Sequence, residues 1–236
     1  GLDAISAGVV LGWATEAFQT GLVDERLTLV PLAFGDQKNY LKALKHISDR
    51  TNDFYRALGD GSAAAAKRYG GEDFAMQLAG NEMAGYHTGY GAVLGAAVGA
   101  RHSHLCNGGY SFDQAEDFSL DTLVDKVLEE ELHRCLLNSM IACLFGRRLY
   151  DRGTIVAALA SIGETHTEET LGAAAVEIYK TKLRLKGRFG FDQLNLQLPK
   201  RFFETPGGGT KLEPEILAGL IRDYVAKCDA LFAEKD

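Results

Sequence analysis

The sequence lacks the features that mark membrane, secreted and nucleic-acid-binding proteins. Its longest uncharged apolar stretch, residues 92–100, is much shorter than the roughly 20 residues that span a bilayer. Its 4 cysteines lack the close pairing of a disulfide-rich scaffold, and no signal-peptide pattern stands before them. We therefore expect a cytoplasmic location and no membrane partner.

Clustered basic residues are also missing. The chain has 25 Lys and Arg against 32 Asp and Glu, for a net charge of -7. Because nucleic-acid binding depends on clustered cations that neutralise phosphates, we expect no nucleic-acid partner. With 236 residues, 46% of them hydrophobic, the chain is large enough to bury a substantial core as a globular protein.

Helical periodicity is what the sequence does contain. Apolar residues recur at helical spacing in five segments, residues 5–17, 38–47, 123–135, 167–183 and 214–231. Asp3 or Ser6 can cap the first of these helices. Segments 27–34 and 89–105 are non-helical or doubtful in this pattern. The sequence therefore predicts an all-α, multihelical fold.

Glycine-rich breakers suggest two helical subdomains. The richest region lies between Tyr69 and Gly85, and we predict a first subdomain over residues 1–78 and a second over 79–236. The chain starts abruptly at Gly1 without an initiator Met, so we expect it to be an excised part of a longer protein, with its first subdomain truncated. The GGGT stretch at 207–210 lacks the Gly-Lys-Ser/Thr ending of a phosphate-binding loop, and we interpret it as a plain loop.

Two segments contain candidate site residues. RHSHLC, residues 101–106, places His102 and His104 on one side only if the backbone is extended. With Cys106 they offer at most three ligands, fewer than the four of a structural zinc site, so one buried and one exposed histidine is the simpler interpretation. Cys143, flanked by apolar residues, is by itself typical of a core cysteine.

Four segments in colinear order resemble a known family. They are GLDAISAG at 1–8, ARHSHL at 100–105, NSMIACLF at 138–145 and LPKRFFETP at 198–206. Each is weak alone, but together they resemble the C-terminal region of the tungsten-containing aldehyde:ferredoxin oxidoreductase family. The resemblance covers essentially the whole chain and implies two helical domains that contact a tungsten (or molybdenum) bis-pterin and a 4Fe-4S cluster in the complete enzyme.

The resemblance assigns roles to the ends of two motifs of the form Asp-x-x-Gly-Leu-Cys/Asp. Residues 1–3 resemble the tail of the first motif, which implies that Asp3 binds pterin. Residues 138–143 resemble the second, which implies that Asn138 binds pterin and that Cys143 is the fourth cluster ligand. The second motif departs from the family pattern, with Asn138 for Asp, Ile141 for Gly and Ala142 for Leu. The other three cluster ligands and the catalytic glutamate belong upstream of Gly1.

The His-Leu pair of the family aligns with His104 and Leu105, which implies that His104 is the active-site histidine. A shift of two residues would assign His102 instead. Arg101 is a candidate anion or pterin contact, and Arg201 a candidate for the lining of the substrate channel. We regard Cys106, Cys135 and Cys228 as structural or incidental thiols.

The resemblance implies a complete enzyme that oxidises small aldehydes to carboxylic acids and passes electrons to ferredoxin. We expect the isolated chain to bind neither tungsten nor a cluster and to be inactive. Reduction of an aromatic thioester, another reaction of the family, and a cofactor-free helical scaffold or binding domain are the alternatives. A homodimer of the complete enzyme is compatible with the resemblance.

Overall fold

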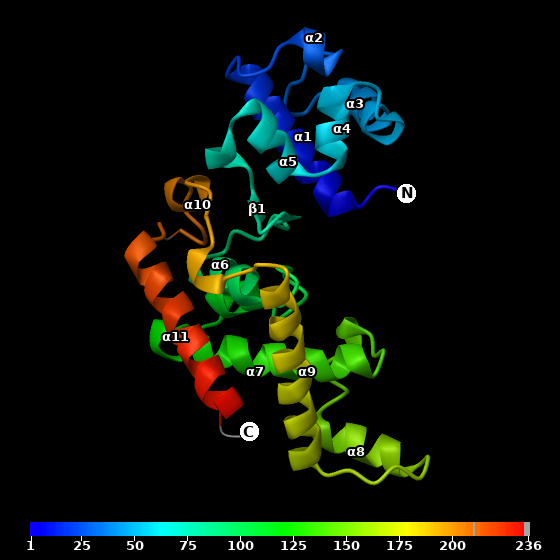
Figure 1. Ribbon diagram of the computed structural model, residues 1–236, viewed down its shortest axis with the longest axis vertical. Coiled ribbons are helices and arrows are strands. Elements are labelled where there is room, and N and C mark those ends of the chain that lie inside the picture. The colour runs from blue at the N-terminus through cyan, green and yellow to red at the C-terminus, as the bar shows by residue number, and fades with distance from the viewer. Residues whose placement is uncertain (210, 234–236) are drawn as a thin grey trace. The chain divides into compact units, whose positions relative to one another are not determined.

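The computed structural model describes residues 1–209 and 211–233, and confirms the all-α prediction (Figure 1). The only strands among these residues, β1 (Gln77–Leu78) and β2 (Asn81–Glu82), pair as a short antiparallel hairpin. The chain divides into two compact units, residues 1–87 with 196–212, and residues 88–195 with 213–236. None of the helices in the described part combines the length and the apolar character needed to cross a bilayer.

The first unit is a cluster of helices around an aromatic core. Trp13, Phe54 and Tyr55 are buried in this core, and the Trp13 Nε1–H donates to the Gly71 carbonyl at 3.1 Å. The helices of this unit are α1 (Ala4–Gln19), α2 (Glu25–Thr28), α3 (Gln37–Asp49), α4 (Asp53–Gly59), α5 (Ser62–Tyr69), η1 (Glu72–Phe74) and α10 (Arg201–Glu204).

The boundary between the units follows residue 87 rather than residue 78, where the glycine breakers placed it. A division after residue 78 would separate β1 from β2. Glu82 of β2 also binds the start of α5, since its Oε1 accepts from Ser62 N at 2.7 Å and from Ser62 Oγ at 3.1 Å. Residues 196–212 belong to the first unit as well, which sequence periodicity does not reveal.

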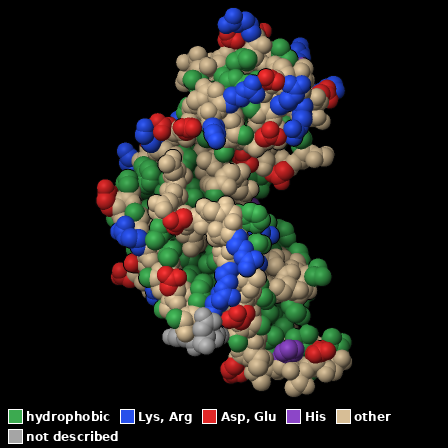
Figure 2. All heavy atoms as spheres, in the orientation of Figure 1, with side chains coloured by type: hydrophobic (Ala, Val, Ile, Leu, Met, Phe, Trp, Pro, Cys, Tyr) green, Lys and Arg blue, Asp and Glu red, His purple; other side chains and the backbone are tan. Residues whose placement is uncertain are grey.

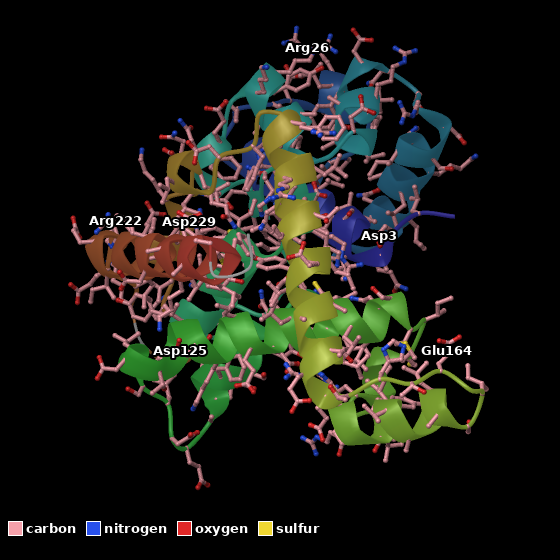
Figure 3. The ribbon with its side chains drawn as sticks, turned by 60° about the horizontal axis from the view of Figure 1, so that its bottom comes forward. Asp3, Arg26, Asp125, Glu164, Arg222 and Asp229 are labelled. Carbon is pink, nitrogen blue, oxygen red and sulfur yellow. The ribbon has the colours of Figure 1, made fainter. Side chains whose placement is uncertain are left out.

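The second unit is built on three long helices. In Figures 1 and 3, α9 (Glu168–Arg188) crosses α7 (Leu120–Ser139), and α11 (Pro214–Ala233) packs against both. The buried hydroxyls of Tyr179 and Tyr224 join α9 to α11 by a 2.9 Å hydrogen bond. The remaining helices of this unit are α6 (Tyr90–Val98), η2 (Gly109–Gln114), η3 (Leu144–Gly146), α8 (Arg152–Ala160) and η4 (Gln193–Asn195).

The helix α6 covers Tyr90–Val98 of the segment that the sequence pattern left non-helical or doubtful, because tertiary contacts override the low helix propensity of glycine. Gly91 and Gly95 lie against the loop at 106–109, where a Cβ on Gly95 would come within 2.3 Å of Asn107 Oδ1. The start of α6 is capped by Asp113, whose two oxygens accept from Gly91 N at 2.7 Å and Ala92 N at 2.8 Å. Glycine is therefore needed here for close packing.

The glycines at 207–209 form a loop, as predicted, in which residues 208 and 209 adopt positive φ. Thr210, the last residue of the GGGT stretch, lies outside the described residues.

Candidate functional site

The RHSHLC segment is separated from the end of α6 by Gly99 and Ala100, and it is folded into successive turns and bends rather than an extended strand. Its two histidines consequently have different surroundings: His102 is buried, whereas His104 is partly exposed. This matches the interpretation with one buried histidine, and it indicates separate roles for the two rings.

His102 closes the C-terminal end of α6. Its Nδ1 lies 3.0 Å from the Ala96 carbonyl and its Nε2 lies 2.6 Å from Lys186 Nζ, so Nδ1–H donates and Nε2 accepts. The edge of the ring contacts Phe191 at a centroid distance of 4.7 Å. Burial, reinforced by the charge of Lys186, lowers the pKa of His102 to about 4. The imidazole is therefore neutral at physiological pH.

His104 is held by its backbone. Its carbonyl accepts from Arg134 Nη1 at 3.2 Å and from Gly108 N at 3.0 Å, and its ring lies near Tyr110 at a centroid distance of 6.2 Å. Partial burial, followed by the charge of Arg134, lowers the pKa of His104 below its ordinary value. A neutral, solvent-accessible imidazole of this kind can accept a proton or donate a hydrogen bond.

Arg101 is exposed, and its backbone N–H donates to Cys106 Sγ at 3.3 Å. Burial raises the pKa of the nearby Glu131, and the positive charge of Arg101 opposes this shift only weakly. Arg201, the candidate channel residue, is paired within the first unit with Glu16 and with Glu204. The predicted contact of Arg101 with an anion or pterin, and of Arg201 with the substrate channel, stay predictions.

The end of α7 closes in a left-handed turn within residues 138–143, the segment that resembles the second family motif. Ala142 N donates to the Leu137 carbonyl at 3.0 Å, and Ile141 N donates to the Asn138 carbonyl at 3.2 Å, which is the Schellman pattern of a helix C-terminus. Ile141 has φ of 57°, a left-handed conformation that normally selects the glycine of the family pattern. The Gly-to-Ile departure therefore leaves the backbone turn in place.

Cys143 follows this turn and differs from the other cysteines. Cys106, Cys135 and Cys228 are buried, and burial raises the pKa of the Cys135 thiol and raises that of Cys228 to about 12. Cys143 is exposed, as is Asn138 one turn earlier. Since a thiolate must be accessible to ligate a metal, Cys143 is the cysteine that suits a cluster.

Apolar side chains surround Cys143 on the surface. Ile141 is 94% exposed and Phe145 is 95% exposed, and Met140, Leu149 and Tyr150 are exposed beside them. Figure 2 shows hydrophobic side chains over the end of α7 and the segment that leads to α8. Exposed apolar side chains that gather in one place are typical of a surface that contacts another molecule.

Asp3 begins α1 in the first unit (Figure 3), as predicted for a capping residue. Its Oδ1 accepts from Ser6 N at 2.7 Å, and this hydrogen bond holds the pKa of the exposed carboxyl below its usual value. The side chain lines a cavity of about 490 Å³ together with Ser6, Arg50, Asp60 and Glu82. The carboxylate is therefore ionised and reachable from a cavity.

The sequence interpretation overlooked Glu131, which is only 1% exposed. The sequence did carry a sign of this residue, because Glu131 falls between Leu128 and Cys135 on the apolar face of α7, where a charged residue is unusual.

In the part of the chain that the structure describes, no group of three or more His, Cys, Asp or Glu side chains is arranged to hold a metal ion.

No curated protein matches the chain. The sequence model for domains 2 and 3 of aldehyde ferredoxin oxidoreductase matches residues 1–226. The chain therefore belongs to the aldehyde ferredoxin oxidoreductase family, of which it represents the helical domains 2 and 3.

Proposed function

We propose that this chain forms the helical part of a tungsten- or molybdenum-pterin enzyme that oxidises aldehydes to carboxylic acids, with ferredoxin as electron acceptor. The observation that supports this most is the exposed thiol of Cys143, which follows a turn whose left-handed residue, Ile141, stands where the family pattern has glycine. This thiol needs three further cluster ligands, which the proposal assigns to sequence preceding Gly1.

The donors in the chain fit the groups that the family implies. Cys143 would supply one thiolate to a 4Fe-4S cluster, and the Asp3 carboxylate and the Asn138 amide would form hydrogen bonds with pterin nitrogens. When bound, the metal-pterin group supplies two-electron oxidation, and the cluster carries the electrons onward one at a time. The protein contributes orientation, hydrogen bonds and exclusion of water.

In this proposal His104 is the residue that contacts the aldehyde substrate. Conversion of an aldehyde and a water molecule to a carboxylic acid releases two electrons and two protons, so a proton acceptor is needed beside the substrate. The lowered pKa of His104 keeps its imidazole neutral and able to accept one of these protons. His102 is the weaker candidate because hydrogen bonds to Ala96 and Lys186 already engage its two ring nitrogens.

Two alternatives are kept. Reduction of an aromatic thioester would use the same donors with a different substrate. A cofactor-free scaffold is favoured by one observation, since Asn138 replaces the acidic residue that usually contacts the pterin. An amide cannot provide the charge of a carboxylate, and this weakens the expected contact with the pterin N–H groups.

The test is to produce the chain together with any coding sequence that precedes Gly1, under anaerobic conditions with tungstate or molybdate supplied. Elemental analysis measures tungsten, molybdenum and iron, and ferredoxin reduction is followed with an aldehyde or an aromatic thioester. Bound metal, iron and aldehyde-dependent reduction of ferredoxin are expected. Metal with thioester chemistry alone would support the second reaction, and a protein with neither metal nor iron would support the scaffold.

A further inference from the structure

One buried carboxylate holds both ends of the histidine segment. Glu131 Oε1 accepts from Ala100 N at 3.2 Å, and its Oε2 accepts from Asn107 Nδ2 at 2.9 Å. Ala100 immediately precedes RHSHLC and Asn107 immediately follows it. A single side chain of α7 therefore binds the residue before and the residue after the loop that contains His104.

Asn107 makes this connection specific. Its side chain is fully buried, and its Nδ2 donates its second hydrogen to the Gly95 carbonyl at 2.9 Å. Its Oδ1 accepts from Gly109 N at 3.1 Å. These partners fix the orientation of the amide, so that an N–H group must face Glu131. Asn107 thereby ties α6 and the loop to the carboxylate on α7.

Arg134, one turn further along α7, holds the middle of the same loop. Its Nη1 donates to the His104 carbonyl at 3.2 Å, and its Nε donates to Glu130 Oε1 at 2.6 Å. The contacts from α7 thus reach the loop at residues 100, 104 and 107. The partly exposed ring of His104 lies at the centre of a segment whose backbone is held on both sides.

Burying a carboxylate is costly, and an apolar residue at such a position is often as stable or more stable. Here each oxygen of Glu131 faces an N–H donor of the loop, which an apolar residue could not bind. We propose that Glu131 is a positioning residue that sets the orientation of His104 for the substrate by clamping residues 100–107 onto α7. This inference rests on the proposed function, in which His104 faces the aldehyde.

The test compares Glu131→Gln with Glu129→Gln. A glutamine side chain has nearly the shape of glutamate, but its single carbonyl oxygen can accept from only one of the two donors, while its NH2 faces the other. Glu129 is exposed on the same helix, so its substitution removes the same charge without touching the loop. Glu131→Asp keeps the charge with a shorter reach, and it is measured in place of the Gln variant if that variant does not fold.

Amide hydrogen exchange reports the clamp directly on this chain. Glu131→Gln is expected to speed exchange over residues 100–108 at least tenfold more than over α9, and to shift the pKa of His104 in an NMR titration. Glu129→Gln is expected to change neither. Exchange that is unaltered in the loop, or that rises equally in the loop and α9, would overturn the clamp.

Activity of the metal-loaded protein tests the consequence. Glu131→Gln is expected to lower kcat for aldehyde oxidation about tenfold, with unchanged metal and iron content and little change in KM. Full kcat in a protein with a loosened loop would overturn the positioning role. A wild-type protein that binds metal but oxidises no aldehyde would instead contradict the proposed function, while the exchange data would still decide whether Glu131 clamps the loop.

Discussion

Ile141 is a β-branched residue in a left-handed backbone conformation, with φ of 57° and a side chain that is 94% exposed. Such a conformation costs an L-residue about 1–2 kcal/mol, whereas glycine adopts it freely at some cost in chain entropy. We predict that Ile141→Gly raises the free energy of unfolding of the second unit by about 1 kcal/mol. Urea unfolding followed by far-UV circular dichroism measures this change.

Ile162→Gly is the control, because Ile162 is also exposed but is not among the residues with positive φ. Glycine at position 162 should leave stability unchanged or lower it. Equal effects of the two substitutions would mean that the turn at residue 141 is not strained.

We predict that the free energy of unfolding falls in acid because of His102. The pKa of its imidazole falls from the ordinary 6.5 to about 4 on folding, so between these values the unfolded chain binds more protons than the folded protein. The contribution of His102 to stability is therefore complete above pH 6.5 and is lost as the pH falls toward 4. The expected loss over this range is about 3 kcal/mol.

His102→Asn separates this effect from other titrations. An asparagine amide can still donate to the Ala96 carbonyl and tolerates the φ of 50° at this position, but it does not titrate. Urea unfolding at pH 7, 6, 5 and 4 should show a flatter pH dependence in the variant. Parallel curves for the two proteins would refute the assignment of the pH dependence to His102.

The packing of helix α6 depends on the absence of side chains where it contacts the loop at 106–109. A methyl group on Gly95 would lie 2.3 Å from Asn107 Oδ1 and 3.1 Å from Gly109 Cα. Although alanine is the better helix former, we predict that Gly95→Ala lowers the free energy of unfolding by about 2 kcal/mol, because the overlap costs more than the gain in propensity. Chemical denaturation measures the loss.

Gly187→Ala in α9 is the matched control for this substitution. A Cβ at Gly187 would meet no neighbouring atom within 4 Å, so alanine there should raise stability by about 0.5 kcal/mol. Destabilisation of similar size at both positions would contradict the close-approach argument. Because the only tryptophan, Trp13, lies in the first unit, circular dichroism suits both variants better than fluorescence.

The sequence predicted those elements that depend on local pattern. The five periodic segments correspond to α1, α3, α7, α9 and α11, because each carries an apolar face at helical spacing. The helix α6 was missed because its glycines have low helix propensity and its stability comes from the loop at 106–109 and from Asp113. Such contacts between distant residues leave no periodic signal.

The site was predictable only in part for the same reason. The family resemblance pointed to His104 and Cys143, but it could not show that His102 is engaged by Lys186, 84 positions later in the sequence. Nor could it show that Glu131 holds the loop of His104, since both partners of this carboxylate lie more than 20 residues away. Long-range hydrogen bonds of this kind are evident only from the fold.

At the scale of the whole molecule, the chain supplies the helical domains 2 and 3 of its family. Asp3 lies in the first unit, and Asn138, Cys143 and His104 lie in the second. Each unit has its own buried core and presents its candidate donors at the end of a long helix or in a loop fixed to one.

Iron content measures whether Cys143 ligates a cluster, as proposed. In the protein produced with any coding sequence that precedes Gly1, iron per chain and the visible absorbance of the cluster are compared for the wild type, Cys143→Ala and Cys228→Ala. We predict that Cys143→Ala loses much of the iron and the absorbance, whereas Cys228→Ala, which removes a buried thiol, retains both. Equal iron and identical spectra in the wild type and Cys143→Ala would contradict this prediction.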